Sequence, residues 1–394
     1  MKALSGILVV DISRVLAGPY CGQLLADMGA DVIKVESPEG DENRRWVPHM
    51  ADGESSNFMS VNRGKRGITL DLKSPDGQAL LRRLVEKADV VIQSFRQGTA
   101  LRLGVDYESL KAINPDVIAC SVNGYGGKGP LADRAGYDLM VQAFSGIMST
   151  TGEEGRSPVR IGVSLNDMST GLIAYGGILS ALYARRDGAG GQHVQVSLLQ
   201  SAVSLLGYHG VGWLQNGVVP RPEGTGSWHL VPYQAFECRD GRFLVGAPND
   251  GAFRRLCEVI GRQDLAADPR FRTNADRLAN KAVLIELLEA TFADGDRDTW
   301  VDRLDAAGVA AAPLHTVDQA MSHPQVLAND LVVDVERPDG TPLKLLGMPF
   351  ALSGTPGSPS GHPPRLGEHT EEVLREVLGV DEQEIARLRA AKAI

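Results

Sequence analysis

The amino-acid sequence predicts an α/β fold with a parallel sheet, followed by a second and smaller domain. Over the first 125 residues, β-branched runs alternate with segments of helical spacing. Strand, helix and strand repeated in this way give parallel pairing through right-handed crossovers. The length of 394 residues exceeds one typical core, so we expect two domains. A turn-rich stretch over 219–227 marks where the second domain begins.

Short elements follow one another in the first domain. Four runs rich in valine and isoleucine predict strands, at 6–12, 31–35, 90–95 and 117–122. A helix over 17–28 fits the spacing of its leucines, and Gly29 is suited to end it. Ser74 is a candidate N-cap for the next helix, which continues through Leu84. A short helix is expected at 108–113.

The rest of the chain continues this alternation and then departs from it. A long helix is expected after Asp167, ending at the glycines of 188–191, and 193–199 begins as a strand. In the second domain, Asp240-Gly241 predicts the turn of a hairpin over 233–245. Helical segments, two strands, a connector rich in proline, glycine and serine, and one charged C-terminal helix complete the chain, at 253–304, 309–314, 331–335, 353–364 and 370–391.

The composition is typical of a folded enzyme and excludes several classes of protein. Charged residues make up 23% and the formal net charge is −9, which argues against a broad nucleic-acid surface. The four cysteines form no CxxC pair, so we expect free thiols in a reducing compartment. The apolar run before Asp11 is too short for a signal peptide, and the most apolar stretch, 202–219, contains His209 and Gln215. We therefore predict a cytoplasmic protein with no membrane or nucleic-acid partner.

A glycine-rich segment follows the strand at 117–122. Gly124 to Gly129 matches G-x-G-x-x-G, the loop that binds a dinucleotide pyrophosphate. Such a loop must run directly into a helix, whereas Pro130 follows here, and no acidic residue stands at the required distance. A flexible loop with several positive-φ glycines is favoured, and dinucleotide binding is the alternative. The histidines show no metal-pair spacing, so no metal site is predicted.

Basic residues cluster in two places, Arg44-Arg45 and the segment 62–73, and two more lie near the end of a strand. The segment 62–73 carries four of them, Arg63, Lys65, Arg66 and Lys73. Arg96 and Arg102 come at the end of the strand at 90–95 and just beyond it. Ligands of a parallel sheet bind outside the C-terminal ends of its strands, where cations can pair with phosphates. A solvated basic face is an equally open alternative.

Asp167 stands at the start of an apolar helix, where an aspartate is by default an N-cap worth on the order of 1 kcal/mol. A series of segments favours another role. They are SRVLAGP at 13–19, GADVIKVE at 29–36, NRGKRGITLDLK at 62–73, Asp167 with Gly171, GQHVQVSLL at 191–199 and RLGEHTEEVL at 365–374. In this order they resemble the family III CoA-transferases, also called the CaiB/BaiF family.

The resemblance implies a fold, an assembly and substrates. A large Rossmann-like domain would be built from both ends of the chain, 1–218 and 331–394, with a smaller α+β domain at 219–330. Two chains would interlock as a homodimer. Acyl-CoA thioesters and small carboxylic acids would be the substrates, with no tightly bound cofactor.

The positions that match the family imply the site residues. Asp167 would be the catalytic nucleophile and would form an aspartyl-CoA thioester. The implied CoA contacts are Val15 and Leu16 near the thioester, Ala135, Gly136, Tyr137 and Asp138 beside the pantetheine, Ser94, Phe95, Arg96 and Arg102 near the nucleotide and phosphates, and Leu70 and Lys73 by the adenine. Ser37 and Ala135 stand where some relatives carry an arginine and a lysine. Gly136-Tyr137 and Gly246-Ala247 are candidate backbone donors to a tetrahedral intermediate.

The subfamily is narrowed by a few positions. The segment at 60–73, with Trp46 before it, is most similar to members that use succinyl-CoA and small dicarboxylic acids. An α-methylacyl-CoA racemase or epimerase of the same fold is the alternative. Racemases carry Gly-His-Asp where Gly136-Tyr137-Asp138 stands, and tyrosine, with a pKa near 10, is a poor base. We predict a CoA-transferase; a non-catalytic CoA- or dinucleotide-binding module is a third possibility.

Overall fold

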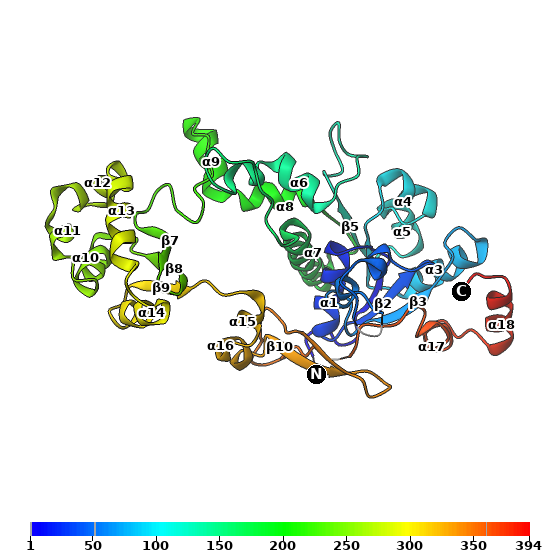
Figure 1. Cartoon of the computed structure of the whole chain (residues 1–394). Coiled ribbons are helices and arrows are strands. Elements are labelled where there is room, and N and C mark those ends of the chain that lie inside the picture. The colour runs from blue at the N-terminus through cyan, green and yellow to red at the C-terminus, as the bar shows by residue number, and fades with distance from the viewer. Residues whose placement is uncertain (1, 51–52, 360) are drawn as a thin grey trace. The chain divides into compact units, whose positions relative to one another are not determined.

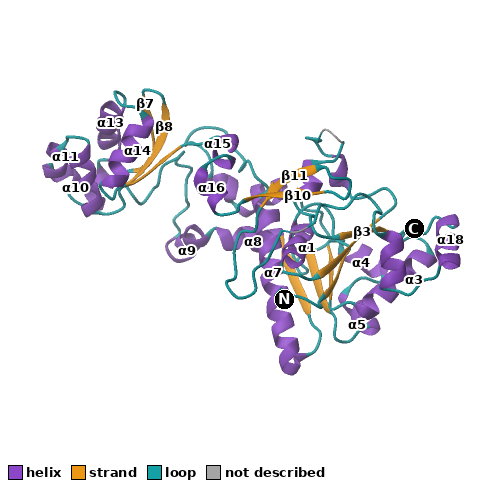
Figure 2. Cartoon of the chain, turned by 90° about the horizontal axis from the view of Figure 1, so that it is seen from below, coloured by secondary structure: helices purple, strands orange, loops and turns teal. Residues whose placement is uncertain are grey.

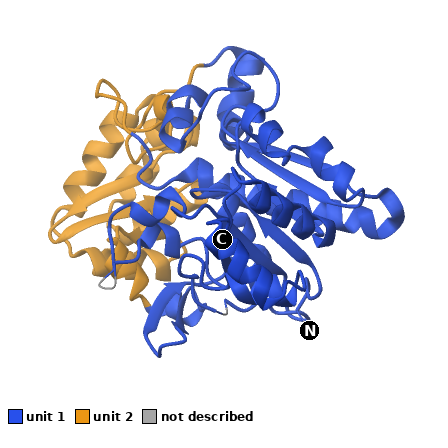
Figure 3. Cartoon of the chain, turned by 90° about the vertical axis from the view of Figure 1, so that its right-hand side faces the viewer, with its two compact units in different colours: residues 1–147, 160–218, 324–394 blue, residues 148–159, 219–323 orange. Residues whose placement is uncertain are grey.

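A computed structural model describes residues 2–50, 53–359 and 361–394. The chain divides into two compact units, coloured separately in Figure 3. Unit 1 comprises 1–147, 160–218 and 324–394, and unit 2 comprises 148–159 and 219–323. Unit 1 is therefore assembled from both ends of the chain, and unit 2 is inserted between them.

A six-stranded parallel sheet forms the centre of unit 1, as the alternating pattern predicts. Its strand order is β3-β2-β1-β4-β5-β6. The strands are β1 (Leu8–Asp11), β2 (Asp31–Glu36), β3 (Arg66–Thr69), β4 (Val90–Gln93), β5 (Ile118–Asn123) and β6 (His193–Ser197). Strand β3 was not predicted, because this edge strand has four residues and begins in a basic segment that shows no clear alternation.

Helices cover both faces of this sheet (Figures 1 and 2). Because successive side chains of a strand point to opposite faces, Val9 packs in one core with α1 and α7, and Val10 packs in the other with α3 and α5. These four helices are α1 (Ala17–Asp27), α3 (Pro75–Lys87), α5 (Tyr107–Ile113) and α7 (Leu165–Ala184). The predicted N-cap of α3 is confirmed, because the Gly77 N–H donates to Ser74 Oγ at 3.0 Å.

The remaining elements of unit 1 are short. Its other α-helices are α2 (Ser56–Met59), α4 (Gln97–Leu103), α6 (Asp138–Ser145), α8 (Leu198–Leu205), α9 (Gly207–Asn216), α16 (Pro324–Ala328), α17 (Thr370–Glu376) and α18 (Glu382–Ala390). A 3₁₀ helix, η1 (Glu42–Arg45), and a π-helical turn, η3 (Arg185–Ala189), accompany them. Strands β10 (Val332–Glu336) and β11 (Pro342–Leu346) form an antiparallel pair, of which only the first was predicted.

The prediction of one continuous C-terminal helix over 370–391 is wrong. The chain forms α17 and α18 with a break between them. Gly379, which follows α17, adopts a positive φ of 64° that ends helical winding. Asp381 then caps α18, accepting a hydrogen bond from the Glu384 N–H at 2.8 Å. The local rule that glycine ends helices and aspartate begins them accounts for the break.

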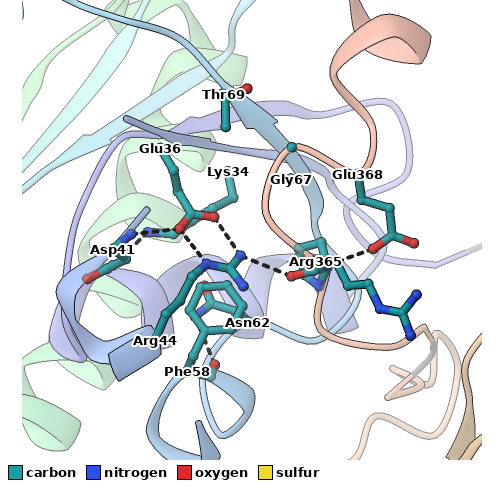
Figure 4. Close-up of polar contacts among 12 residues, drawn as sticks. Lys34, Glu36, Asp41, Arg44, Phe58, Asn62, Gly67, Thr69, Arg365 and Glu368 are labelled. Atoms are coloured by element: carbon teal, nitrogen blue, oxygen red, sulfur yellow. Dashed lines mark hydrogen bonds and ion pairs between the residues drawn. The ribbon is translucent and has the colours of Figure 1, made fainter. Parts of the chain in front are cut away.

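The C-terminal segment also covers the β3 edge of the parallel sheet (Figure 4). The Gly64 N–H donates to the His362 carbonyl at 3.2 Å, and the His369 N–H donates to the Gly67 carbonyl at 2.8 Å. The Thr69 N–H donates to a side-chain oxygen, Thr370 Oγ1, at 3.1 Å. An unpaired strand edge is a template for aggregation, and this segment satisfies the edge of β3 instead.

Unit 2 has its own sheet and core. The predicted hairpin is formed by β7 (Tyr233–Cys238) and β8 (Gly241–Gly246), and β9 (Ala310–Pro313) pairs antiparallel with β8. Its helices are η2 (Ile147–Thr150), which begins at the boundary with unit 1, α10 (Asp250–Val259), α11 (Gln263–Ala267), η4 (Pro269–Phe271), α12 (Asn274–Ala279), α13 (Lys281–Phe292), α14 (Arg297–Ala306) and α15 (Val317–Met321). Five phenylalanines are fully buried in the core, Phe236, Phe243, Phe253, Phe271 and Phe292. Among the helices that the structure describes, in either unit, none is long and apolar enough to cross a membrane.

Candidate active site

A cavity of about 380 Å³ opens in unit 1 where β1, β4 and β5 end. Its walls come from 14–18 after β1, from 94–99 after β4, from 122–124 at the end of β5 and from 132–137 before α6. Asp167, from the first turn of α7, also lines the cavity, as do Glu42 and Leu198. This is the edge of a parallel sheet at which ligands bind.

The start of α7 decides what Asp167 can do. The helix begins at Leu165, so Asp167 lies within its first turn, and Ser164 precedes it without a side-chain cap. The capping group is Asp138 at the start of α6, whose Oδ2 accepts hydrogen bonds from the Asn166 N–H at 2.7 Å and from the Asp167 N–H at 3.3 Å. The N-cap interpretation of Asp167 is therefore wrong, because another aspartate caps the helix.

The carboxylate of Asp167 has an unusual environment. It accepts no hydrogen bond from any residue that the structure describes, although it lies in the wall of the cavity. Burial raises the pKa of Asp167 to about 7, and the neighbouring charge of Asp138 adds to this rise. A carboxylate that is neither paired nor hydrogen-bonded keeps its lone pairs available, so at neutral pH an ionised Asp167 can act as a nucleophile.

The loop after β1 is held in a strained conformation beside this cavity. Val15 has a φ of 70°, which is rare for a β-branched residue. Its N–H donates to Asp41 Oδ2 at 3.1 Å, and its carbonyl accepts from Asn43 Nδ2 at 2.6 Å. The Arg14 N–H donates to Ser94 Oγ at 2.9 Å. These bonds hold the loop against the segments that follow β2 and β4. A strained backbone conformation persists only where surrounding contacts of this kind hold it.

Asp41, which holds this loop, belongs to a buried ion-pair cluster (Figure 4). Lys34 Nζ lies 3.2 Å from Asp41 Oδ2, and both side chains are fully buried. The Asp41 N–H donates to Glu36 Oε2 at 2.9 Å. The Arg44 guanidinium donates two hydrogen bonds to the Glu36 carboxylate, from Nε at 2.8 Å and from Nη2 at 2.7 Å. Arg44 Nη2 also donates to the Pro364 carbonyl at 3.0 Å, so the C-terminal segment is tied to the same cluster.

Three of the four basic residues of 62–73 also serve the structure. Arg63 Nη2 lies 2.6 Å from Asp27 Oδ2, and Lys65 Nζ lies 2.8 Å from Asp11 Oδ2. Arg66 pairs with Asp31 at the sheet edge. Arg63 and Lys65 therefore belong neither to a phosphate site nor to a solvated basic face, the two alternatives from the sequence, because both side chains are buried in ion pairs. Burial opposes ionisation of Asp11, yet Lys65 and Lys34 hold the pKa of Asp11 below its ordinary value.

Lys73, the fourth, is exposed in a second cavity of about 720 Å³. This cavity shares Arg14, Phe95 and Thr99 with the first one and continues along 34–41 and 70–73. The two cavities adjoin within unit 1, and Asp167 lines the first of them. We refer to the two together as the channel. A long, thin ligand with one reactive end fits this shape.

Most of the predicted site residues meet in this channel. Val15, Ser94, Phe95, Arg96, Ala135, Gly136, Tyr137 and Asp167 line the first cavity. Leu70, Lys73, Phe95 and Arg102 line the second, as does Ser37. Leu16 and Asp138 line neither cavity. Leu16 is buried where α1 begins, and the Asp138 side chain accepts hydrogen bonds from the first N–H groups of α7. Gly246 and Ala247 belong to unit 2.

The glycine-rich segment has a structural explanation. No helix lies between the end of β5 and Asp138, so the requirement of a dinucleotide loop is not met. Gly126 and Gly129 have φ values of 98° and 88°, which fits the flexible-loop interpretation. A Cβ on Gly124 would lie 2.7 Å from the Gly136 Cα. The close contact of these two glycines brings 136–138 against the end of β5, at the cavity.

Several residues of the first cavity were not predicted from the sequence. Arg14, Glu42, Thr99 and Arg134 line it and were not among the predicted contacts. Arg14 follows the first strand directly, so the rule that ligands bind at the C-terminal ends of strands could have found it. Nothing local distinguishes Arg134, which reaches the cavity through the loop before α6.

The fold and the site define an α/β enzyme with a free carboxylate at one end of a channel lined by unpaired cations. The family model described as CoA-transferase family III matches residues 4–370, and the chain belongs to that family. It is a CoA-transferase, as the sequence analysis predicts.

Curated proteins and solved structures agree with this assignment. The chain is 41% identical to the succinate–glutarate CoA-transferase of Agrobacterium fabrum, an alignment that covers 95% of each chain. It is 35% identical to the succinyl-CoA–D-citramalate CoA-transferase of Chloroflexus aurantiacus, covering 100% of this chain and 98% of that one. The crystal structure of a CAIB/BAIF family protein from Brucella suis matches with a TM-score of 0.86 at 41% identity, covering 95% and 99% of the two chains.

Proposed function

We propose that this enzyme moves CoA from an acyl-CoA donor, most simply succinyl-CoA, to a small carboxylic or dicarboxylic acid through an aspartyl-CoA thioester on Asp167. The observation that carries the proposal is the Asp167 carboxylate, which lines the cavity without a hydrogen-bond partner among the residues that the structure describes. A pKa of about 7 leaves a substantial fraction of it ionised at neutral pH. No resident cofactor is required, because exchanging CoA between two carboxylic acids is nearly thermoneutral.

The proposed reaction balances without any further reactant. Asp167 attacks the thioester carbonyl carbon, the carbon–sulfur bond of the tetrahedral intermediate breaks, and CoA leaves as a thiolate, so that a mixed anhydride of Asp167 and the donor acid remains. The thiolate then attacks the Asp167 carbonyl carbon and expels the donor acid as a carboxylate. The acceptor carboxylate attacks the aspartyl-CoA thioester, and the same two steps run in reverse. Asp167 is regenerated and the acceptor carries the CoA.

The shape and charge of the channel support CoA as the carrier. Arg14, Arg96 and Arg102 form no ion pair with any residue that the structure describes, so their charges are available to phosphates. Arg14 lines both cavities and stands between Asp167 and the region of Lys73. The predicted contacts at Leu70 and Lys73 would then lie at the nucleotide end, and those at Val15 and Gly136 at the thioester.

The choice of donor and acceptor rests on the relatives. Succinate or succinyl-CoA stands in the names of both curated relatives, whereas the second acid differs, glutarate in one and D-citramalate in the other. Succinyl-CoA is therefore the donor to test first, with a panel of small dicarboxylic acids as acceptors. The racemase alternative loses support, because Tyr137 occupies the place of its histidine base.

The assembly is also a proposal. Large apolar side chains are exposed on α6 and on α9 of unit 1, namely Leu139, Met140, Phe144, Val211, Trp213 and Leu214. Apolar faces of this kind mark protein interfaces, and we propose that a second copy covers them in an interlocked homodimer. Light scattering after gel filtration should give twice the chain mass of 42.1 kDa. A mass of one chain at micromolar concentration would contradict the dimer.

Mass spectrometry of the covalent intermediate tests the function. The protein is incubated with succinyl-CoA alone, quenched in acid and digested, and the peptide with Asp167 is examined. We expect a CoA adduct that hydroxylamine removes, and none in Asp167→Asn. An adduct on another peptide would move the nucleophile elsewhere. Deuterium uptake at the α-carbon of a branched acyl-CoA, with no adduct from any donor, would favour the racemase.

A further inference from the structure

The last residues of the chain lie against the wide end of the channel. Lys392 lines the second cavity together with Lys73 and Arg102. It is separated in sequence from these residues by about three hundred positions, and neither the resemblance nor the pattern of the chain pointed to it. Its side chain is exposed, whereas its neighbour Ala393 is fully buried.

The backbone around Lys392 is fixed. The Lys392 N–H donates to the Arg389 carbonyl at 3.0 Å, and the Ala393 N–H donates to the Leu388 carbonyl at 3.0 Å. This pair of bonds is the Schellman arrangement that ends a helix, and it places Lys392 at a φ of 56°, where glycine is the usual residue. The Asp71 N–H then donates to the Ala393 carbonyl at 2.9 Å, which ties the tail to the 70–73 loop. Glycine rather than lysine is the residue that this helix end favours, so the helix end does not account for a lysine at this position.

The charges around Lys392 favour an anion. Four cations line this cavity without an ion pair to any residue in the described part of the chain, namely Arg14, Lys73, Arg102 and Lys392. Of the four acidic residues that line it, Glu36 is paired with Arg44 and Asp41 with Lys34. Glu39 and Asp71 alone remain against the four cations. The lining of this cavity therefore carries a net positive charge.

We infer that Lys392 binds a phosphate group at the nucleotide end of CoA, so that the C-terminal tail forms one wall of the nucleotide site. The inference rests on the proposed CoA-dependent function of the same channel. Two phosphate sources share this chemistry, the phosphate on the ribose and the diphosphate bridge, and both fit a lysine ammonium.

Binding of CoA to the whole protein, measured by calorimetry, tests this inference. The informative variant is Lys392→Gly, because glycine accepts the positive φ without strain and so preserves or improves the helix end. We expect CoA to bind about threefold to tenfold more weakly, the range of a partly solvated charge-assisted hydrogen bond. Lys392→Arg should restore most of the affinity. Lys87→Ala, which removes an exposed lysine of α3 that lines neither cavity, is the control and should bind CoA as the wild type does.

Dephospho-CoA, which lacks the ribose phosphate, distinguishes the two sources. If Lys392 contacts the ribose phosphate, wild type and Lys392→Gly bind dephospho-CoA equally. If it contacts the diphosphate, the variant loses affinity for both ligands. Equal binding of CoA by wild type and Lys392→Gly overturns the inference, whatever the thermal stability of the variant.

The failure of this inference is distinguishable from failure of the proposed function. Wild type that binds CoA but forms no Asp167 adduct with any donor would contradict the transferase mechanism and leave the Lys392 comparison valid. Wild type that forms the adduct, with unchanged CoA affinity in Lys392→Gly, would remove the Lys392 contact alone. Wild type that binds no CoA would overturn both.

Discussion

Two groups of charges lie within unit 1, and they differ in whether each charge has a partner. In the first group, which lies in and next to β1, β2 and β3, Lys65 is paired with Asp11 and Lys34 with Asp41. Around the first cavity, Asp167 and Arg14 have no ion-pair partner among the described residues. Burying a charge is costly unless it is paired, so paired charges are part of the fold. The Asp167 carboxylate, which is unpaired although burial raises its pKa, is explained by what binds in the cavity beside it.

The largest effect is expected at the unpaired carboxylate. Asp167→Asn should lower CoA transfer by at least about 10³-fold, because the amide cannot attack the thioester. A rate within tenfold of the wild type would exclude Asp167 as the nucleophile. Initial rates with succinyl-CoA and a dicarboxylic acid panel measure this, with Ser164→Ala as a neighbouring control.

The same substitution should raise stability. Between about pH 4 and pH 7 the unfolded chain ionises Asp167 while the folded protein, with a pKa of about 7, keeps the proton. The unfolded state therefore binds fewer protons, and the free energy of unfolding falls as the pH rises through this window. Asp167→Asn should gain in Tm over the wild type at about pH 8 and gain less at about pH 5. An equal Tm difference at both values would contradict the raised pKa.

Removing one partner of a buried ion pair should lower stability, whereas Asp167→Asn should raise it. Lys65→Met leaves Asp11 buried without its partner and should lower the free energy of unfolding by about 3–5 kcal/mol. Urea unfolding followed by circular dichroism gives this number. Lys73→Met, which removes an exposed cation of the second cavity, should leave the unfolding curve unchanged and weaken CoA binding. Similar losses of stability in both variants would remove the distinction between the two groups.

The pH dependence sharpens the comparison further. Because only the ionised form of Asp167 attacks, the rate of adduct formation should rise about tenfold per pH unit below pH 7 and level off above it. Asp138→Asn removes the charge that adds to the raised pKa, so it should move the midpoint to lower pH. Stopped-quench measurement of the adduct gives both profiles. A midpoint near the ordinary value of an aspartate, about pH 4, would show that burial does not control Asp167.

The smallest effect concerns the helix cap. Asp138→Ala removes the acceptor of the Asn166 and Asp167 N–H groups and should cost about 1 kcal/mol of stability. Ser164→Ala should cost nothing measurable, because Ser164 makes no capping bond. Thermal unfolding of the two variants side by side checks this. A larger loss of stability in Ser164→Ala than in Asp138→Ala would show that Asp138 is not the capping residue.

Much of the fold was predictable because it depends on neighbours in the chain. The alternation of Val9 and Val10 between two cores, the cap at Ser74 and the end of the first helix at Gly29 are local properties of the sequence. The break at Gly379 was equally local, and a stricter use of the same rule would have predicted it. Resemblance to a family pointed to Asp167, which local patterns alone assigned to a cap.

Which charges are free was decided only by the tertiary structure. Arg63, Lys65 and Lys73 stand within eleven residues, yet the first two are buried with Asp27 and Asp11 while the third faces a cavity. The cap that the local pattern assigned to Asp167 is supplied by Asp138, because the Asp138 side chain reaches the Asn166 N–H across twenty-eight positions of the sequence. Lys392 reaches the channel from the opposite end of the sequence. Sequence alone sets residue type and local conformation, whereas the partner of a charge depends on which distant segments the fold brings within a few ångströms.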